Sequence, residues 1–299
     1  MKRQSVINWL IPLIVIFAAI SAAVGLFSVN GDGPFEFTTL RHEIVEIYGR
    51  GLYQNDTMLI AVGFRVGDAF TLFVGIPLLL ISFGMYRRGS IRGGILLTGT
   101  LIYFLYTYSS LALGAAYNNL FLAYILLTMM SLFGMLILIM SFDQQTLPAM
   151  FSARLPRRGI SIFLTLSGVI LFCIWLLLSI VPALITGIVP AEVASYTTII
   201  TFVLDMGIVA PALMVSGKML SRCEPLGYIL ASVLLVFIDI LGCALILMGI
   251  AQEIAGLMNI GQFVGFVVSF AILTLFSIGL TIALFRSITD PTPEQTIKF

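Results

Sequence analysis

Three aspartates and one arginine lie inside long apolar stretches of this 299-residue chain. Arg65 and Asp68 occur in AVGFRVGDAF, so on a helix their side chains would share a face and could form an ion pair. Asp205 and Asp239 occur in two other apolar stretches. A carboxylate in such surroundings can exchange a proton, bind a cation or hold a cationic ligand. These four residues are therefore the first candidates for a functional site.

The elements that must position these residues are membrane-spanning helices. Hydrophobic residues make up 60% of the chain and charged residues only 10%, with a mean hydropathy of +1.12, which excludes an ordinary soluble domain. Apolar runs of about 20 residues, enough to cross roughly 30 Å of hydrocarbon, predict eight helices. They lie at about residues 7–27, 58–84, 93–116, 119–141, 159–186, 194–216, 226–251 and 260–285. Because barrel strands are short and alternating, we expect instead a single all-α transmembrane bundle.

The Lys and Arg residues of the loops predict the orientation of these helices. With a cytoplasmic N-terminus, the cytoplasmic side receives twelve basic residues and the outer side receives two. The twelve are Lys2, Arg3, Arg87, Arg88, Arg92, Arg154, Arg157, Arg158, Lys218, Arg222, Arg286 and Lys298, and the two are Arg41 and Arg50. Both termini should therefore be cytoplasmic. An alternative treats residues 1–23 as a cleavable signal peptide, although the apolar run exceeds the roughly 7–15 residues usual for one.

The depth of the three acids indicates that they could share one site. Asp68 lies about ten residues from the outer end of its segment, or roughly 15 Å, which is close to the bilayer midplane. Asp205 and Asp239 fall near the middle of their own segments. If all three converge on Arg65, a net charge of about minus two requires a bound proton, cation or cationic ligand. In the alternative, Arg65 and Asp68 are a packing pair, and the other two acids are neutral and separately hydrogen-bonded.

Two tyrosines of the third apolar segment favour a polar interior. Tyr103 and Tyr106 begin a stripe at helical spacing that continues with Ser110 and Tyr117. A phenol can donate a hydrogen bond to a carboxylate and line a wet cavity, so Tyr103 and Tyr106 join the four charged residues as predicted substrate- or proton-binding groups. The alternative for both is hydrogen bonding between helices, and Tyr117 could equally be an interfacial anchor.

Prolines follow two of the buried acids. Pro77 and Pro211 would free the carbonyls of Phe73 and Gly207, which can either bind a cation or simply accompany a kink. An Asp followed by a Pro in the second and sixth segments would also fit a duplication of four helices, with halves divided at residues 142–158.

The outer loop, residues 28–57, is the largest predicted extramembrane piece. Leu40, Ile44 and Ile47 have helical spacing and predict a short amphipathic helix on the membrane surface. On such a helix, His42 and Glu46 could ligate a metal, but the second histidine of an H-E-x-x-H motif is absent. We therefore expect a solvated interfacial helix and no metal site.

Residues 67–127 resemble a known family. The segments GDAFTLFVGIPLLL and RRGSIRGGILLTGTLIYFLYTYSSLALGAAYNNLFLAYILL are similar to a family of uncharacterised bacterial integral membrane proteins. Its members share a G-D-x-x-T-L…P-L-L segment, an R-R-G-S-x-R-G turn, and a Y-x-Y segment followed by N-x-L-F. The resemblance implies a bacterial cytoplasmic membrane and no particular substrate.

Several classes of function fit these features. The leading hypothesis is a transporter or permease for a small solute or cation, possibly coupled to protons, with Arg65 setting the charge of the acids. A membrane enzyme acting on a lipid or prenyl substrate is the alternative, followed by a sensor or assembly subunit. A closed pocket reaching all three aspartates would favour transport, whereas a lateral opening to lipid beside His42 and Glu46 would favour an enzyme. No sequence feature predicts a cofactor, a nucleic-acid partner, a catalytic residue or an oligomeric state.

Overall fold

The computed structural model describes residues 2–143 and 147–289. Within them, eight helices are long and apolar enough to cross a membrane. They are Gln4–Phe27, Met58–Arg87, Ile91–Gly114, Phe121–Ile139, Arg157–Thr186, Ile200–Ser221, Pro225–Ile254 and Ile260–Ser287. The prediction of an all-α bundle is confirmed, and the protein is a multi-pass membrane protein. The largest shift of a boundary is in the sixth span, because hydropathy marks apolar residues and not the point where the backbone becomes helical.

Five of the spans are single α-helices: α1 (Lys2–Phe27), α4 (Ile91–Gly114), α5 (Phe121–Ile139), α10 (Pro225–Ile254) and α11 (Ile260–Ser287). The second span joins α2 (Met58–Phe70), η2 (Thr71–Gly75) and α3 (Ile76–Arg87). The fifth joins α6 (Arg157–Trp175), η4 (Leu176–Ile180) and α7 (Val181–Thr186), and the sixth joins α8 (Ile200–Leu204), η6 (Asp205–Val209) and α9 (Ala210–Ser221).

A π-helical turn interrupts each of these three composite spans just before a proline. The turns are η2, η4 and η6, and the prolines are Pro77, Pro182 and Pro211. Proline has no amide proton and clashes with the preceding turn, and the extra residue of a π-turn accommodates both defects. A π-turn therefore replaces the simple kink that the prolines predicted.

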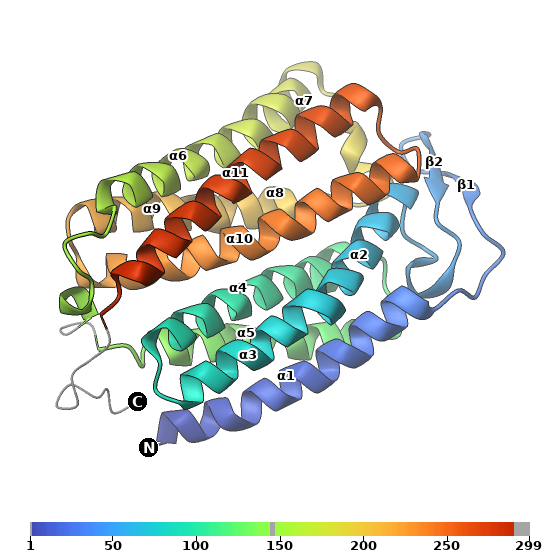
Figure 1. Ribbon diagram of the computed structural model, residues 1–299. Coiled ribbons are helices and arrows are strands. Elements are labelled where there is room, and N and C mark those ends of the chain that lie inside the picture. Colours follow the sequence, from blue (N-terminus) through green and yellow to red (C-terminus); the bar gives the residue numbers. More distant parts are fainter. Residues whose placement is uncertain (1, 144–146, 290–299) are drawn as a thin grey trace.

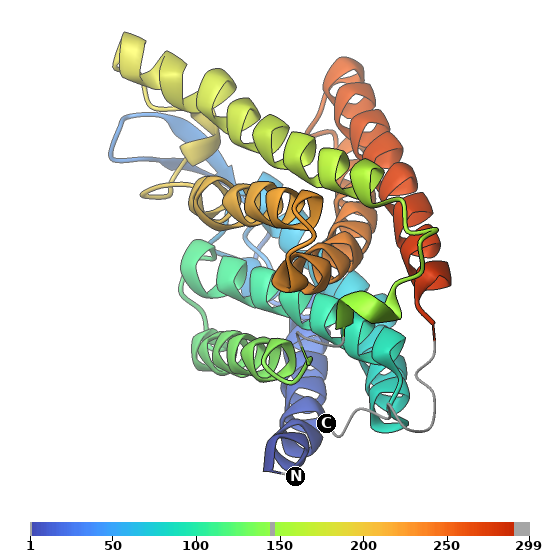
Figure 2. The same ribbon diagram turned by 90° about the vertical axis from the view of Figure 1, so that its left-hand side faces the viewer.

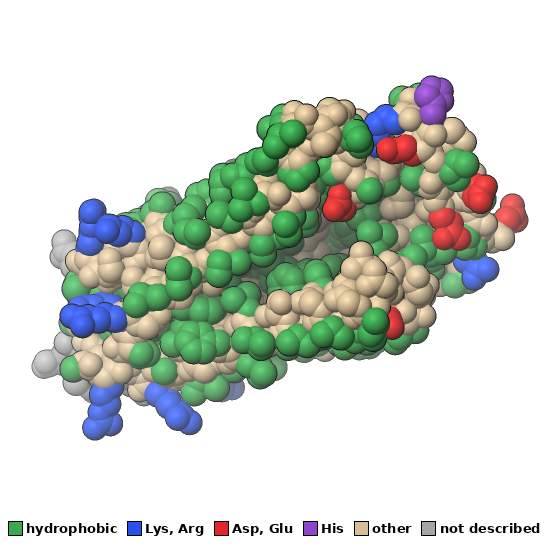
Figure 3. All heavy atoms as spheres, turned by 90° about the horizontal axis from the view of Figure 1, so that it is seen from above, with side chains coloured by type: hydrophobic (Ala, Val, Ile, Leu, Met, Phe, Trp, Pro, Cys, Tyr) green, Lys and Arg blue, Asp and Glu red, His purple; other side chains and the backbone are tan. Residues whose placement is uncertain are grey.

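The helices form two groups that meet along α10. Figure 1 shows α1–α5 on one side and α6–α11 on the other, and α10 packs against α4, α2, α9 and α11. The spans α6–α7 and α11 diverge toward one end of the bundle, as Figure 2 shows. Near the other end the rings of Phe163 and Phe276 lie 5.4 Å apart. Between these diverging spans Figure 3 shows a furrow lined by hydrophobic side chains.

The two ends of the bundle differ in charge. Lys and Arg side chains gather at the end where α6 begins and α11 ends, which we call the basic end (Figure 3). Acidic side chains and the histidine gather at the opposite end, which carries the outer loop and which we call the hairpin end (Figure 3). The positive-inside rule predicts that the basic end faces the cytoplasm.

The outer loop contains a β-hairpin and not the predicted amphipathic helix. Strand β1 (Phe35–Thr38) pairs antiparallel with β2 (Ile44–Ile47), with Phe35 opposite Ile47 and Thr38 opposite Ile44. FEFT and IVEI are rich in aromatic and β-branched residues, which favour strands. His42, with a φ of 63°, turns the chain between the strands, so the helical spacing of the apolar residues was misleading.

Candidate functional site

Arg65 does not pair with Asp68. Its guanidinium donates hydrogen bonds to the hydroxyl of Tyr48 and, at 3.0 Å, to the carbonyl of Leu26. Leu26 is the penultimate residue of α1 and Tyr48 follows β2, so the charge reaches toward the hairpin end and away from the midplane. No ion pair joins Arg65 to Asp68 in the described chain, although the two side chains are close enough to interact electrostatically. The Nε atom of Arg65 is buried without a hydrogen-bond partner.

Asp68 is buried against α1 and the outer loop. The hydroxyl of Tyr53 donates to its Oδ2 at 2.7 Å. Gly25 makes the close approach possible, because a Cβ on this residue would lie 1.9 Å from the same oxygen. Asp68 is thus a satisfied acid that joins the first two spans to the loop between them.

The two predicted tyrosines have different partners. The hydroxyl of Tyr103 lies 3.0 Å from that of Thr71, the first residue of η2. The hydroxyl of Tyr106 instead donates to Oδ1 of Asp205 at 2.9 Å. Trp175 at the end of α6 donates its indole N–H to the other carboxylate oxygen of Asp205, also at 2.9 Å. The acid at the start of η6 therefore ties α4 to α6.

Asp239 lies in the middle of α10, where Ser277 and Thr281 of α11 face it. Its Oδ1 atom is buried and makes no short hydrogen bond, although the hydroxyls of Ser277 and Thr281 are close enough to interact with the carboxylate. The three midmembrane acids therefore have separate sets of neighbours, and among the described residues no common group contacts Asp68, Asp205 and Asp239. The structure does not bring the three carboxylates together around Arg65.

Asp56 is a buried acid that was not recognised in the sequence. Its side chain is fully buried, and its Oδ1 accepts hydrogen bonds from the amide of Ala116 and the hydroxyl of Tyr196, both at 2.8 Å. The same tyrosine hydroxyl accepts a hydrogen bond from the amide of Thr57 at 3.2 Å. Asp56 thus connects three loops at the hairpin end. Burial raises its pKa from 3.8 to about 6. Nothing in QNDT signals this role, because polar residues before a span usually face solvent.

A lateral groove of about 490 Å³ opens beside Arg65. Its wall is one face of α2 and η2, completed by one residue each from α1 and α10. The lining residues are Leu26, Val62, Arg65, Val66, Ala69, Phe70, Phe73, Val74 and Leu247. Phe73 is 65% exposed, so this wall reaches the outside of the bundle, where lipid would lie. Arg65 is the only polar side chain among the lining residues.

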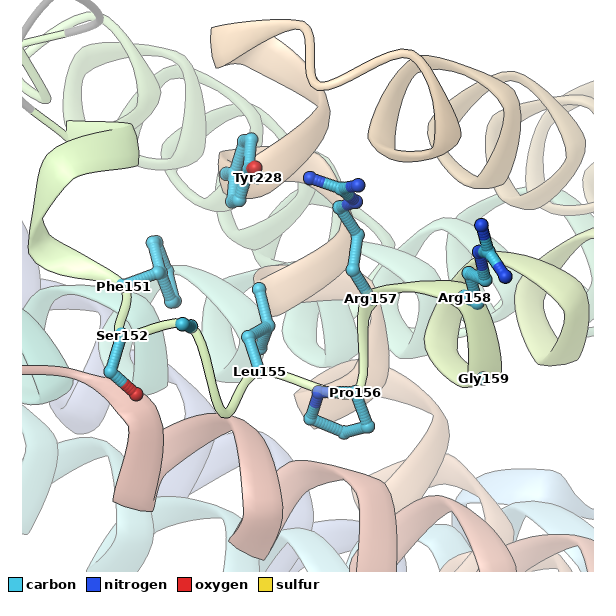
Figure 4. A pocket seen from close by; sticks show the side chains of 9 residues that line it. Phe151, Ser152, Leu155, Pro156, Arg157, Arg158, Gly159 and Tyr228 are labelled. Carbon is cyan, nitrogen blue, oxygen red and sulfur yellow. The ribbon is translucent and has the colours of Figure 1, made fainter.

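A second cavity, of about 530 Å³, lies at the basic end. It is lined by residues 151–153 and 155–159, which lead into α6, and by Tyr228 of α10. Figure 4 shows the guanidinium of Arg157 directed toward Tyr228 and that of Arg158 directed away from it. Both basic side chains line the cavity and no acid does, so its charge is suited to an anion.

The remaining predicted site residues do not form a metal centre. His42 lies in the hairpin turn and Glu46 lies in β2, so they do not share a helix face. No group of three or more His, Cys, Asp or Glu side chains suited to a metal occurs within residues 2–143 and 147–289. The lateral opening to lipid is beside Arg65 and not beside these two residues.

Comparison with protein-family models, curated proteins and solved structures finds no match to this chain. The class that the fold defines is therefore that of a multi-pass helical membrane protein. Its function has to be argued from the groove and from the buried polar residues themselves.

Proposed function

We propose that the protein binds an anionic, lipid-like amphiphile from the outer half of the bilayer. The observation that supports this proposal is the groove beside Arg65, an apolar channel that opens to lipid and contains a single cationic group. Ligand sites usually combine mostly apolar walls with a few polar groups that fix orientation. Here the apolar wall would hold a hydrocarbon chain and Arg65 would hold the charged head group.

The dimensions of the groove agree with this arrangement. Its wall runs along α2 and η2 from Val62 to Val74, which at about 1.5 Å per residue is roughly 18 Å. Arg65 lies near the end of this wall that is closer to the hairpin. A chain lying along the wall would point toward the membrane centre, with its head group at the level of the hairpin, as in the surrounding leaflet.

Arg65 is suited to bind a phosphate or carboxylate. The planar guanidinium presents several donors, which match such anions with two parallel hydrogen bonds. Tyr48 and Leu26 occupy two nitrogens, and Nε is left without a partner. Arg65 forms no ion pair among the described residues, and the nearby Asp68 is engaged by Tyr53, so an anionic head group would supply a countercharge.

The groove supports binding better than catalysis. Apart from Arg65, the lining consists of Leu, Val, Ala and Phe side chains, which supply neither a nucleophile nor a general acid or base. Asp68 is one turn away but is engaged by Tyr53 on the side of α1. An enzyme acting on a lipid would require such a group within reach of the bound head group.

The test is lipid binding to protein purified in mild detergent, measured by native mass spectrometry. Wild-type protein should retain an anionic phospholipid in preference to a zwitterionic phospholipid with the same chains. Arg65→Gln should abolish this preference, whereas the matched control Arg50→Gln, an exposed arginine at the same end, should not. Ala69→Phe should reduce binding of both lipids, because it fills the groove and retains the charge. Equal retention of the two lipids by wild type would refute the proposal.

Transport of a small solute or cation is a second candidate, favoured by the surroundings of Asp205. This acid begins a π-turn, and such turns are frequent at functional sites because the irregular backbone can rearrange. Its ties to Tyr106 and Trp175 would have to change during transport. The flux of the solute or cation into proteoliposomes should therefore be lost in Asp205→Asn. It should be kept in Asp32→Asn, a control variant in the exposed outer loop.

A further inference from the structure

The interface between α10 and α11 contains a row of buried oxygen atoms that make no short hydrogen bond, although Ser277 and Thr281 lie close enough to the Asp239 carboxylate to act as donors to it. Thr274, Ser277 and Thr281 of α11 each have a side-chain oxygen in this state, and so does Asp239 of α10. The three hydroxyl residues are at most 9% exposed. Their spacing of three and four residues places them on one face of α11. A buried polar atom without a partner is rare in a folded protein and requires an explanation.

Several other buried hydroxyls of the membrane helices bond to their own helix, whereas Ser21 and Ser131 are, like the α11 group, without a partner. Thr98, Thr100, Ser216 and Ser232 each donate to the carbonyl four residues earlier, at 2.6 to 2.8 Å. This is the usual way in which Ser and Thr are satisfied inside membrane helices. The three α11 hydroxyls do not make this bond. Ser277 and Thr281 face the Asp239 carboxylate instead.

The backbone brings the two helices close at this point. Gly242 lies one turn after Asp239, and a Cβ placed on it would be 2.0 Å from the hydroxyl oxygen of Thr274. Thr274 is thus packed against Gly242, while Ser277 lies one turn along α11 beside Asp239.

Asp239 also lacks a countercharge. No Lys or Arg of the described chain forms an ion pair with it, and Cys243 is the only other titratable side chain found to interact with it. A carboxylate in the middle of a membrane helix is costly unless a cation or a proton neutralises it. The side chain is only partly buried.

We propose that Asp239, Ser277 and Thr281 form a binding site for a sodium ion. Carboxylate and hydroxyl oxygens are hard ligands, which suit alkali and alkaline-earth cations and not soft metals. One acid balances one positive charge, so a monovalent ion leaves the site neutral, whereas a divalent ion would leave a net charge in the membrane. Thr274 borders the site one turn away, and water completes the coordination. The site is independent of the groove beside Arg65.

Sodium-dependent stabilisation of the purified protein tests the site. An ion that binds only the folded state raises its stability in a saturable manner. The melting temperature should rise with sodium chloride, against choline chloride at constant ionic strength, and the sodium NMR signal should broaden in the presence of protein. Ser277→Ala and Thr281→Val should each weaken the apparent sodium affinity at least about ten-fold. Asp239→Asn should abolish the sodium response.

The matched control is Ser232→Ala, which removes a buried hydroxyl of α10 that already bonds to its own helix. This variant should keep the wild-type sodium response even if its overall stability changes. Equal stabilisation by sodium and choline would overturn the proposal, and so would a sodium response that survives in Asp239→Asn. A protein that responds to pH but not to sodium would place a proton at Asp239 in place of the ion and would equally overturn it.

Discussion

Because Asp56 is buried, we expect the free energy of unfolding of the protein to increase as the pH falls from neutral. The folded-state pKa of Asp56, about 6, exceeds its ordinary value of 3.8, because burial disfavours the charged form more than Ala116 and Tyr196 stabilise it. Between these two values the folded state binds more protons than the unfolded state. The free energy of unfolding therefore falls as the pH rises through this interval and is constant above it.

The size of the effect follows from the shift in pKa. A difference of about two units, at about 1.4 kcal/mol per unit, corresponds to roughly 3 kcal/mol between pH 4 and pH 7. Asp56→Asn removes the titration and retains an oxygen that can accept from Ala116 and Tyr196. Its amide group, however, would occupy the place of Oδ2, which has no partner, at a cost of about 1–3 kcal/mol. The variant should therefore lose the pH dependence without a large gain in stability at pH 7.

Unfolding in detergent micelles, followed by intrinsic fluorescence from pH 4 to pH 8, measures this effect. Other groups titrate in the same range, so the informative quantity is wild type minus Asp56→Asn at each pH. Glu192→Gln, an exposed acid at the same end, is the matched control and should leave the wild-type curve unchanged. A difference curve that is flat, or that rises with pH, would show that Asp56 is already ionised at no cost in the folded protein.

Two further predictions concern Asp68. Gly25→Ala should destabilise the protein by about 1–3 kcal/mol, because the added methyl group would overlap the Asp68 carboxylate, whereas Gly84→Ala, with nothing within 4 Å, should be neutral or stabilising. Similar melting temperatures for the two variants would contradict the close packing of α1 on α2. A double-mutant cycle of Arg65→Gln and Asp68→Asn should show a coupling of about 0.5–1 kcal/mol, since the two side chains have different hydrogen-bond partners and interact only through their charges. A coupling of several kcal/mol would restore the ion pair that their spacing predicted.

The sequence was sufficient to predict the eight spans and their order. The bilayer imposes a length of about 20 apolar residues, so each span is encoded within a single continuous segment. The same information could not predict the neighbours of a buried side chain. Asp205 meets Trp175 and Tyr106 because α6 and α4 both pack near η6, and this depends on the packing of three distant segments.

The spacing of Arg65 and Asp68 along one helix was misleading because their partners come from segments distant in the sequence. Arg65 and Asp68 are close in sequence, but Leu26 and Tyr48 lie close enough to take the guanidinium, and Tyr53 takes the carboxylate. A rule for isolated helices cannot include partners that come from other elements. The hairpin was missed in a similar way, because a few apolar residues can match a helical period and a strand pattern at once.

Hydrogen bonding distinguishes the charged residues that hold the helices together from those that are candidates for binding a ligand. Asp68 and Asp205 have partners that join helices, and these contacts explain their presence without any ligand. Nε of Arg65 and Oδ1 of Asp239 make no short hydrogen bond, although both are buried. In a membrane, where water cannot satisfy such atoms, an unmatched charge persists only if something else balances it. In the two proposals made above, an anion balances the charge at Arg65 and a cation balances the charge at Asp239. Two ligands of opposite charge are therefore expected at two separate places, and the loss of one should leave the other bound.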